Sequence, residues 1–183
     1  MFSDAFCLTQ AVLSGTKTMT RRLLKDNVPL GNWEETKKHL PYKVGEVVAI
    51  AQSYKEVYPN ADFEMIGDKF MTESAGWSNK MFVRADLMPR HIEFTDVKVE
   101  RLQDISDKEC LREGVKRASI GFYAEGVKVK DCEKEAHRET ASGCLKLFPF
   151  PRQAFASLID KISGNGTWKN NPFVAAYSFE LID

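Results

Sequence analysis

The stretch RHIEFTDVKVERL, residues 90–102, decides the fold class of this protein. Apolar and polar residues alternate along it, which is typical of a strand that buries one face. Ile92 and Phe94 share one face, whereas the valines that follow, beginning at Val97, continue the alternation in the opposite phase. Such a slip indicates a β-bulge near Thr95–Asp96, and a bulge bends a strand as a small barrel requires.

Three further segments, all C-terminal to this strand, have clear patterns. Residues 173–181 alternate between two faces and predict a closing strand. Residues 151–164 begin with proline, end with glycine and carry an apolar stripe at helical spacing, so they predict a helix. Ser106 and Glu109 form a capping box, which predicts a short helix that ends at Gly114.

The rest of the chain completes an α+β protein, mostly β with short helices. We predict a helix between Asp4 and Gly15, a loop over residues 26–43, and strands from Val47 to about Tyr54 and from Met81 to Ala85. Because few helices separate strands as β-α-β units, we expect a small, bent, mostly antiparallel barrel with helices at its openings. We interpret residues 1–183 as a single domain with insertions at about 58–80 and 116–150.

Composition narrows the classes of function. The 183 residues carry 26 Lys plus Arg and 26 Asp plus Glu, so the formal net charge is zero. Proteins that coat long duplexes are usually clearly basic, which argues against that class but permits a local basic cleft. No apolar stretch has the length of a membrane span, and the first residues lack the pattern of a signal peptide, so we expect a cytoplasmic protein. The four cysteines include no C-x-x-C pair and the three histidines are scattered, so we expect neither a metal site nor a cofactor.

The segment GTKTMTR, residues 15–21, resembles the G-x-K-x-x-T-x-R signature of the ASCH family, whose fold is a PUA-like barrel. Residues 42–47, 96–115 and 155–180 are similar to the strand entry, the central strand with its helix, and the closing helix with its strand. The resemblance is greatest to phage and prophage ASCH proteins. A more distant branch consists of amidohydrolases that remove the acetyl group of acetylcytidine.

The resemblance implies a cleft that binds RNA or a modified nucleotide. In the amidohydrolase branch the matching residues are catalytic, which makes Lys17 the proton acceptor, Thr20 the nucleophile and Glu113 the proton donor. The chain departs from the phage relatives in the second strand, where AQSY at 51–54 keeps an aromatic residue but lacks their Arg-Glu pair.

Each catalytic candidate also has a structural interpretation. Lysine accepts a proton only if burial or a neighbouring cation lowers its pKa, and Lys17 is alternatively a solvated residue just past a helix. A hydroxyl such as that of Thr20 needs an adjacent base before it becomes a nucleophile. Glu113 lies in the last turn of a predicted helix, where it is alternatively a surface residue before a glycine.

The candidate ligand-binding residues come from two segments. Arg21, Arg22 and Lys25 form a basic run that suits contact with phosphate, although such a run is alternatively a solvated edge. Gln52 and Tyr54 alternate on a predicted strand, where Tyr54 could stack on a base and Gln52 could read its edge. Alternatively the tyrosine is part of the barrel wall.

Three functions remain open from the sequence. We favour binding of RNA or a nucleoside or nucleotide through a basic cleft, because a fold of this kind is mainly a recognition scaffold. The first alternative is an amidohydrolase that deacylates a cytidine-type nucleoside. The second is a non-catalytic phage accessory protein that binds a protein partner through the two insertions.

Overall fold

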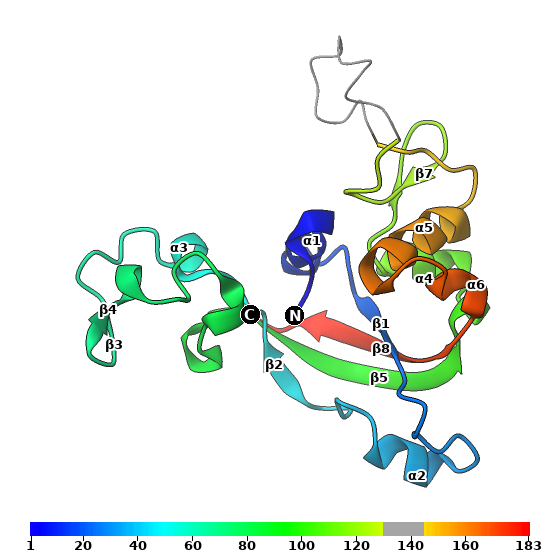
Figure 1. The fold of residues 1–183 in the computed structure, drawn as a ribbon, viewed down its shortest axis with the longest axis horizontal. Helices are drawn as coiled ribbons and strands as arrows, with labels where there is room; N and C mark the ends of the chain where they lie inside the picture. The colour runs from blue at the N-terminus through cyan, green and yellow to red at the C-terminus, as the bar shows by residue number, and fades with distance from the viewer. Residues whose placement is uncertain (130–144) are drawn as a thin grey trace.

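A four-stranded antiparallel sheet forms the centre of the computed structural model, which describes residues 1–129 and 145–183 (Figure 1). The strands occur in the order β1 (Met19–Leu23), β8 (Phe173–Leu181), β5 (His91–Arg101) and β2 (Val47–Ala49). The predicted bulge is confirmed, because the register of β5 against β8 shifts between Phe94 and Asp96. The sheet curls as a half-barrel with β1 and β2 at its edges, so the predicted α+β class is confirmed.

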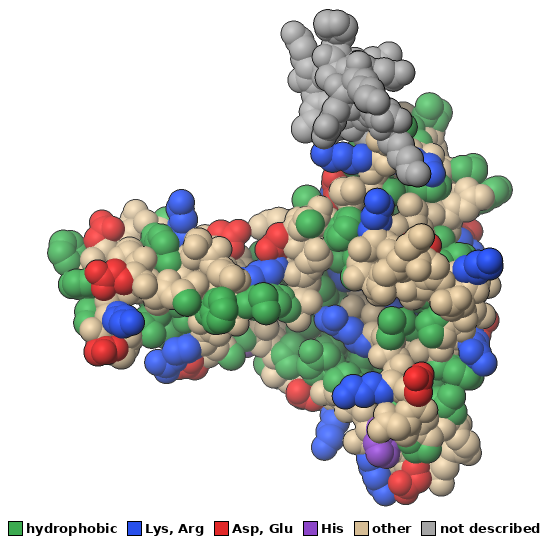
Figure 2. Space-filling view, in the orientation of Figure 1, with side chains coloured by type: hydrophobic (Ala, Val, Ile, Leu, Met, Phe, Trp, Pro, Cys, Tyr) green, Lys and Arg blue, Asp and Glu red, His purple; other side chains and the backbone are tan. Residues whose placement is uncertain are grey.

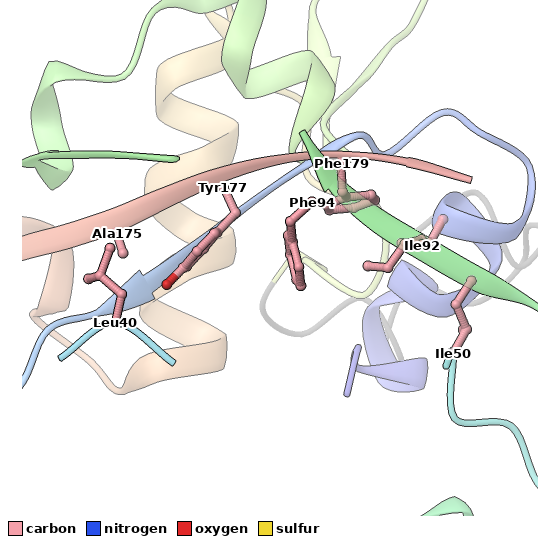
Figure 3. Close-up of a cluster of buried hydrophobic side chains, with 8 residues drawn as sticks. Leu40, Ile50, Ile92, Phe94, Ala175, Tyr177 and Phe179 are labelled. Atoms are coloured by element: carbon pink, nitrogen blue, oxygen red, sulfur yellow. The ribbon is translucent and has the colours of Figure 1, made fainter. Parts of the chain in front are cut away.

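The main hydrophobic core lies on the inner face of this sheet (Figure 3). The bulge brings the two halves of β5 into phase, so Ile92, Phe94 and Val97 all contribute to this side. Tyr177 and Phe179 of β8 pack beside them, and helix α1 (Leu8–Leu13) covers the core after the short helix η1 (Asp4–Phe6). This core fixes the position of β1, which carries the sequence motif.

Three helices pack on the other face of the sheet (Figure 1). They are α4 (Asp107–Arg112), α5 (Pro151–Ser163) and α6 (Thr167–Asn170), with η5 (Leu102–Asp104) leading into α4. The predicted capping box is confirmed, since Ser106 Oγ accepts from the backbone of Glu109 and the Glu109 carboxylate accepts from the backbone of Ser106. Phe155 and Ile159 of α5 bury against Leu102 and Cys110. This packing brings the end of α4 close to β1.

The first insertion is more ordered and longer than its sequence suggested. Residues 54–88 form a lobe beside the sheet, at the left of Figure 1, with a small core of its own around Tyr54, Met71 and Met88. Its elements are α3 (Tyr54–Val57), β3 (Met65–Ile66), β4 (Lys69–Phe70), η2 (Met71–Glu73), η3 (Lys80–Phe82) and η4 (Ala85–Leu87).

One predicted strand is therefore too long, and another is wrong. The strand that starts at Val47 ends at Ala49, because Ser53 caps α3 through a capping box with Glu56. Residues 81–85 belong to short 3-10 turns of the lobe, where Asn79 accepts a hydrogen bond from the backbone of Met81. Local capping thus overrides the apolar run in both segments.

Two other segments complete the described chain. Helix α2 (Trp33–Lys38) lies within the predicted loop 26–43 and is capped by Asn32, whose side chain accepts from Glu34 N at 2.9 Å. The second insertion begins with β6 (Lys116–Arg117) and β7 (Phe122–Tyr123), which pair with each other. Residues 130–144, which hold most of a further helix suggested by the sequence at 128–139, lie outside the described residues.

Candidate functional site

Lys17 lies in the turn between α1 and β1, with its side chain directed inward. Gly15 adopts φ 69°, and Lys17 N then donates to Ala11 O at 2.8 Å, which fixes the turn. The residue is 2% exposed, and Lys17 Nζ donates to the carboxylate of Glu113 at 2.7 Å and to its carbonyl oxygen at 2.8 Å. The interpretation of Lys17 as a solvated lysine is therefore wrong.

Glu113 occupies the C-cap of α4 and is also buried, at 4% exposure. Its second carboxylate oxygen accepts from Arg21 Nη1 at 3.1 Å. Helix α4 is tied to the start of β1 because Thr18 N donates to Arg112 O at 2.9 Å and Arg112 Nε donates to Thr18 Oγ1 at 2.9 Å. The interpretation of Glu113 as a surface residue is wrong, since α4 is anchored with its C-terminus over β1.

Arg21 is surrounded by carboxylates rather than by open space. Its Nη2 lies 2.6 Å from Glu100 Oε1 and 3.2 Å from Glu109 Oε2. Lys98 bridges the same two glutamates, at 2.8 Å from Glu100 and 2.7 Å from Glu109. We call this group the ion cluster; its members are Lys17, Arg21, Lys98, Glu100, Glu109 and Glu113. With three cations and three carboxylates it balances its own charge.

Burial and ion pairing shift pKa values in opposite directions in the ion cluster. Burial lowers the pKa of the Lys17 ammonium, and the attraction of Glu113 offsets part of that effect. Burial would also lower the pKa of Arg21, yet Glu113, Glu100 and Glu109 together raise it. Burial would raise the pKa of Glu109, but hydrogen bonds from Lys98 and Ser106 lower it to about 2. The cluster therefore keeps Glu109 charged, while burial makes Lys17 easier to deprotonate.

Five of the eight candidate residues line one hollow of about 290 Å³, which we call the Lys17 hollow. The candidates that it brings together are Lys17, Thr20, Arg21, Arg22 and Glu113. Its opposite wall is apolar and comes from α5, including Phe155 and Ile159. Thr20 is buried, and its hydroxyl forms no hydrogen bond with Lys17 or with any other described residue. The hollow combines a hydroxyl, an ion pair and an apolar wall.

Arg22 lies on the opposite face of β1 from Arg21, because adjacent strand residues point to opposite sides. It pairs in register with Ala175, and Thr20 pairs with Tyr177. Both Thr20 and Arg22 also line a second hollow of about 340 Å³, which we call the Phe94 hollow. Arg22 Nη2 has one long contact, 3.4 Å from Met1 O, and its buried Nε has no hydrogen-bond partner among the described residues. No described carboxylate forms a salt bridge with this arginine.

The other three candidates lie away from the Lys17 hollow. Lys25 is exposed beyond the end of β1. Gln52 is partly buried, and its backbone donates to Met88 Sδ at 3.4 Å. Tyr54 is 1% exposed in the core of the lobe, where its hydroxyl accepts from Arg84 N at 2.8 Å. The prediction that Gln52 and Tyr54 share a strand face is wrong, because the strand has ended before them and Tyr54 begins α3.

The sequence interpretation missed Lys98, Glu100 and Glu109 as members of the site. Two signals were available. Lys98 and Glu100 are two residues apart on a strand, so they share a face, and Glu109 and Glu113 are four apart on a helix. Their meeting with Arg21 needed the pairing of β1, β8 and β5, which local sequence does not specify.

Cys110 does not join the chemistry of the site, although it lies on the same helix as Glu113. Burial raises the pKa of its thiol to about 12, so it is a thiol at neutral pH. Across residues 1–129 and 145–183, no group of three or more His, Cys, Asp or Glu side chains is arranged to hold a metal ion. In the same ranges no helix is both long and apolar enough to cross a membrane.

Comparisons with known proteins give one similar structure. The sequence matches no protein-family model and no curated protein. The fold is similar to the crystal structure of an ASCH domain from Lactobacillus crispatus JV V101, with 15% sequence identity and a TM-score of 0.40. The similarity covers 99% of this chain and 76% of that one. Membership of the ASCH family stays a prediction from the sequence motifs.

Proposed function

We propose that the protein binds RNA or a modified nucleotide through the Lys17 hollow and the adjoining Phe94 hollow. The observation that carries the proposal is Arg22, a partly buried cation that lines both hollows and has no carboxylate partner among the described residues. An arginine in this state retains its capacity to bind an anion, because its charge is not already neutralised.

The contrast with Arg21 makes this assignment specific. Arg21 forms salt bridges with three glutamates and belongs to a balanced cluster, so it serves to position Lys17 and Glu113 rather than to bind phosphate. Arg22 is next to Arg21 in sequence but points to the opposite side of β1, and it lines both hollows, whereas Arg21 lines only the Lys17 hollow. Of the three basic residues in the predicted phosphate-binding run, Arg22 has the position that suits the role.

The walls beside Arg22 suit a nucleobase. Tyr42 and Phe94 line the Phe94 hollow and stack on each other with ring centroids 4.6 Å apart. The two hollows share four lining residues, namely Met1, Phe2, Thr20 and Arg22, so they are neighbours across β1. Their volumes, about 290 and 340 Å³, are at the small end of the range for ligand pockets. A single nucleotide or a short unpaired segment has the appropriate size, which agrees with a chain of zero net charge.

The test is to titrate labelled nucleotides and short single-stranded RNAs into the protein and into Arg22→Gln. We expect saturable binding that weakens with salt, and at least a tenfold loss in Arg22→Gln, since a charge-assisted phosphate contact contributes about 1.5–3 kcal/mol. Arg117→Gln is the matched control, because Arg117 is exposed on β6 and lines neither hollow. Equal affinities for the two variants would refute the role of Arg22.

A second candidate, an amidohydrolase acting on an acylated cytidine-type nucleoside, is favoured by one observation. Lys17 Nζ and Glu113 Oε2 are 2.7 Å apart and line the same hollow as Thr20. In such a reaction the Lys17 ammonium first passes its proton to the Glu113 carboxylate, 2.7 Å away. The Thr20 oxygen then bonds to the acyl carbon while its proton passes to the neutral Lys17 amine, and the C–N bond breaks as the leaving amine takes the proton from Glu113. Water then hydrolyses the acyl-threonine. The step needs Thr20 to turn toward Lys17, which is why this function ranks second.

The amidohydrolase is tested with acetylcytidine as substrate and chromatography as the readout. We expect turnover in the wild-type protein, loss in Thr20→Val and retention in Thr20→Ser, which keeps the hydroxyl. Turnover that survives in Thr20→Val would exclude Thr20 as the nucleophile. Absence of turnover in all three proteins would leave binding as the function of the site.

Binding of a protein partner through the insertions stays a prediction. The first insertion carries exposed apolar residues at the β3–β4 hairpin, and Phe63 is 89% exposed. Much of the second insertion lies within residues 130–144, outside the described part of the chain.

A further inference from the structure

A third hollow lies between α2 and the sheet, and it contains none of the residues that the sequence motif identified. Its volume is about 560 Å³, larger than either hollow beside Arg22. We call it the Trp33 hollow. Two aromatic residues and three lysines line it, namely Trp33, Tyr42, Lys37, Lys38 and Lys43, together with aliphatic side chains.

The Trp33 hollow adjoins the site already described. Tyr42 lines both the Trp33 hollow and the Phe94 hollow, and Arg22 lines both the Phe94 hollow and the Lys17 hollow. The three hollows therefore follow one another from β1 to α2. Figure 2 shows Lys and Arg side chains spaced along this side of the molecule, with hydrophobic surface between them.

The charge of the Trp33 hollow is one-sided. Three lysines line it and no aspartate or glutamate does. Lys37 and Lys38 pair with Glu34 and Glu35, but these pairs are exposed and contribute little stability. Their ammonium groups can exchange those partners for phosphate at small cost. Lys43 is exposed and forms no salt bridge with the described residues.

The two aromatic residues of the Trp33 hollow differ in how firmly their rings are held and how exposed they are. Tyr42 is fixed, because it stacks on Phe94 and meets Tyr177 edge-on at 5.6 Å. Trp33 is 45% exposed at the start of α2. A fixed ring beside an accessible one, with cations around them, is the combination with which proteins bind unpaired bases and the phosphates that join them. Paired bases expose no stacking face, so the arrangement favours a single strand.

We propose that the Trp33 hollow extends the binding site to a single-stranded RNA of several nucleotides, running from Arg22 past Tyr42 to Trp33 and Lys43. This inference rests on the proposed function, since it assumes that nucleic acid occupies the hollows beside Arg22. It adds the class of ligand, an oligonucleotide rather than a mononucleotide, and the residues that bind its distal part.

The test compares two ligands on the full chain. A dinucleotide occupies the hollows beside Arg22, whereas a single-stranded RNA of about eight nucleotides also reaches the Trp33 hollow. We expect the longer RNA to bind about tenfold more tightly. In Trp33→Ala and Lys43→Ala this advantage is lost while the dinucleotide affinity is unchanged, and Trp33→Phe, which keeps a ring, retains most of it.

Phe63→Ala and Lys69→Ala serve as matched controls, because both residues are exposed on the lobe and line none of the three hollows. Equal affinity of the wild type for both RNA lengths, or equal losses for both in Trp33→Ala, would overturn the extension and leave the proposed function standing. Failure of the wild type to bind either RNA would overturn both. Self-association of the wild type that disappears in Trp33→Ala would assign the surface to a second copy of the chain and so also overturn the extension.

Discussion

The ion cluster and the Trp33 hollow each contain three cations, yet the two regions use them differently. In the ion cluster, Lys17 and Arg21 are buried and each contacts a carboxylate, so their charge is neutralised within the protein. Around the Trp33 hollow the lysines are at the surface, where Lys37 and Lys38 have only exposed partners, Glu34 and Glu35, and Lys43 has no salt bridge with a described residue. The same residue types therefore either stabilise the fold or stay available to a ligand, according to how deeply they are buried and how firmly they are paired.

The largest expected effect comes from a substitution that breaks the buried ion cluster. Glu113→Gln removes the charge that compensates both Lys17 and Arg21, and leaves Lys17 as a buried cation without an anion. Removal of one partner of a buried ion pair costs about 3–5 kcal/mol, and we expect a loss of that size in the free energy of unfolding in urea. Glu64→Gln on the exposed surface of the lobe is the control. A loss below about 1 kcal/mol would mean that Lys17 becomes neutral in this variant at a small cost in free energy.

Gly114→Ala tests the turn that holds Glu113 beside Lys17. Gly114 has φ 106°, and a Cβ there would lie 3.1 Å from Leu8 Cδ2 and 3.8 Å from Lys17 Cδ. We expect a loss of about 1–3 kcal/mol in the free energy of unfolding. Gly31→Ala is the matched substitution, because a Cβ at Gly31 would meet open space and its φ is not left-handed. Equal stabilities of the two variants would contradict the role of the turn.

Low pH is expected to change the stability that Glu109, a partly exposed member of the ion cluster, contributes. The folded-state pKa of Glu109 is lowered from 4.5 to about 2, so its contribution to stability is complete above pH 4.5 and is lost as the pH falls toward 2. We expect unfolding free energies measured across this range to fall less steeply in Glu109→Gln than in the wild type. Glu73→Gln, on an exposed turn of the lobe, is expected to retain the wild-type slope.

The smallest effects are expected where the cations reach solvent. Lys98 is a member of the ion cluster but its side chain is 44% exposed, and we expect Lys98→Met to cost about 0.2–1 kcal/mol in thermal or urea unfolding. Lys43→Gln is expected to change stability by less than about 0.5 kcal/mol, although it weakens RNA binding. A large loss of stability in Lys43→Gln would remove the contrast between the two regions.

The sequence predicted the elements whose signals are local. The bulge in β5, the capping box at Ser106 and the helix after Pro151 all depend on neighbouring residues, and all three are confirmed. The strand expected up to Tyr54 was wrong for the same reason, because a second capping box at Ser53 outweighed the apolar run before it.

The site was harder to predict because it depends on long-range pairing. The motif indicated Lys17, Thr20 and Glu113 by resemblance, and they do line one hollow. Nothing local distinguished Arg21 from Arg22, since which of two adjacent strand residues faces α4 is set by the register of β1 on β8. The Trp33 hollow was not predicted because the segment that forms α2 was interpreted as a loop.

The bulge at Thr95 also has a consequence for how this sequence can vary. On one side of it the even-numbered residues of β5, such as Phe94, face the apolar core; on the other side the odd-numbered residues do, and even-numbered Lys98 and Glu100 face Arg21. At Thr95, therefore, the residues that face the core change from even-numbered to odd-numbered positions. Because Phe94 pairs with Phe179 and Asp96 with the adjacent Ser178, deletion of Thr95 would leave a regular strand in which Lys98 and Glu100 still face Arg21. A lineage can therefore replace or lose Thr95 with both faces of β5 intact, whereas the loss of one further residue beside it would exchange the two faces of the strand beyond that point.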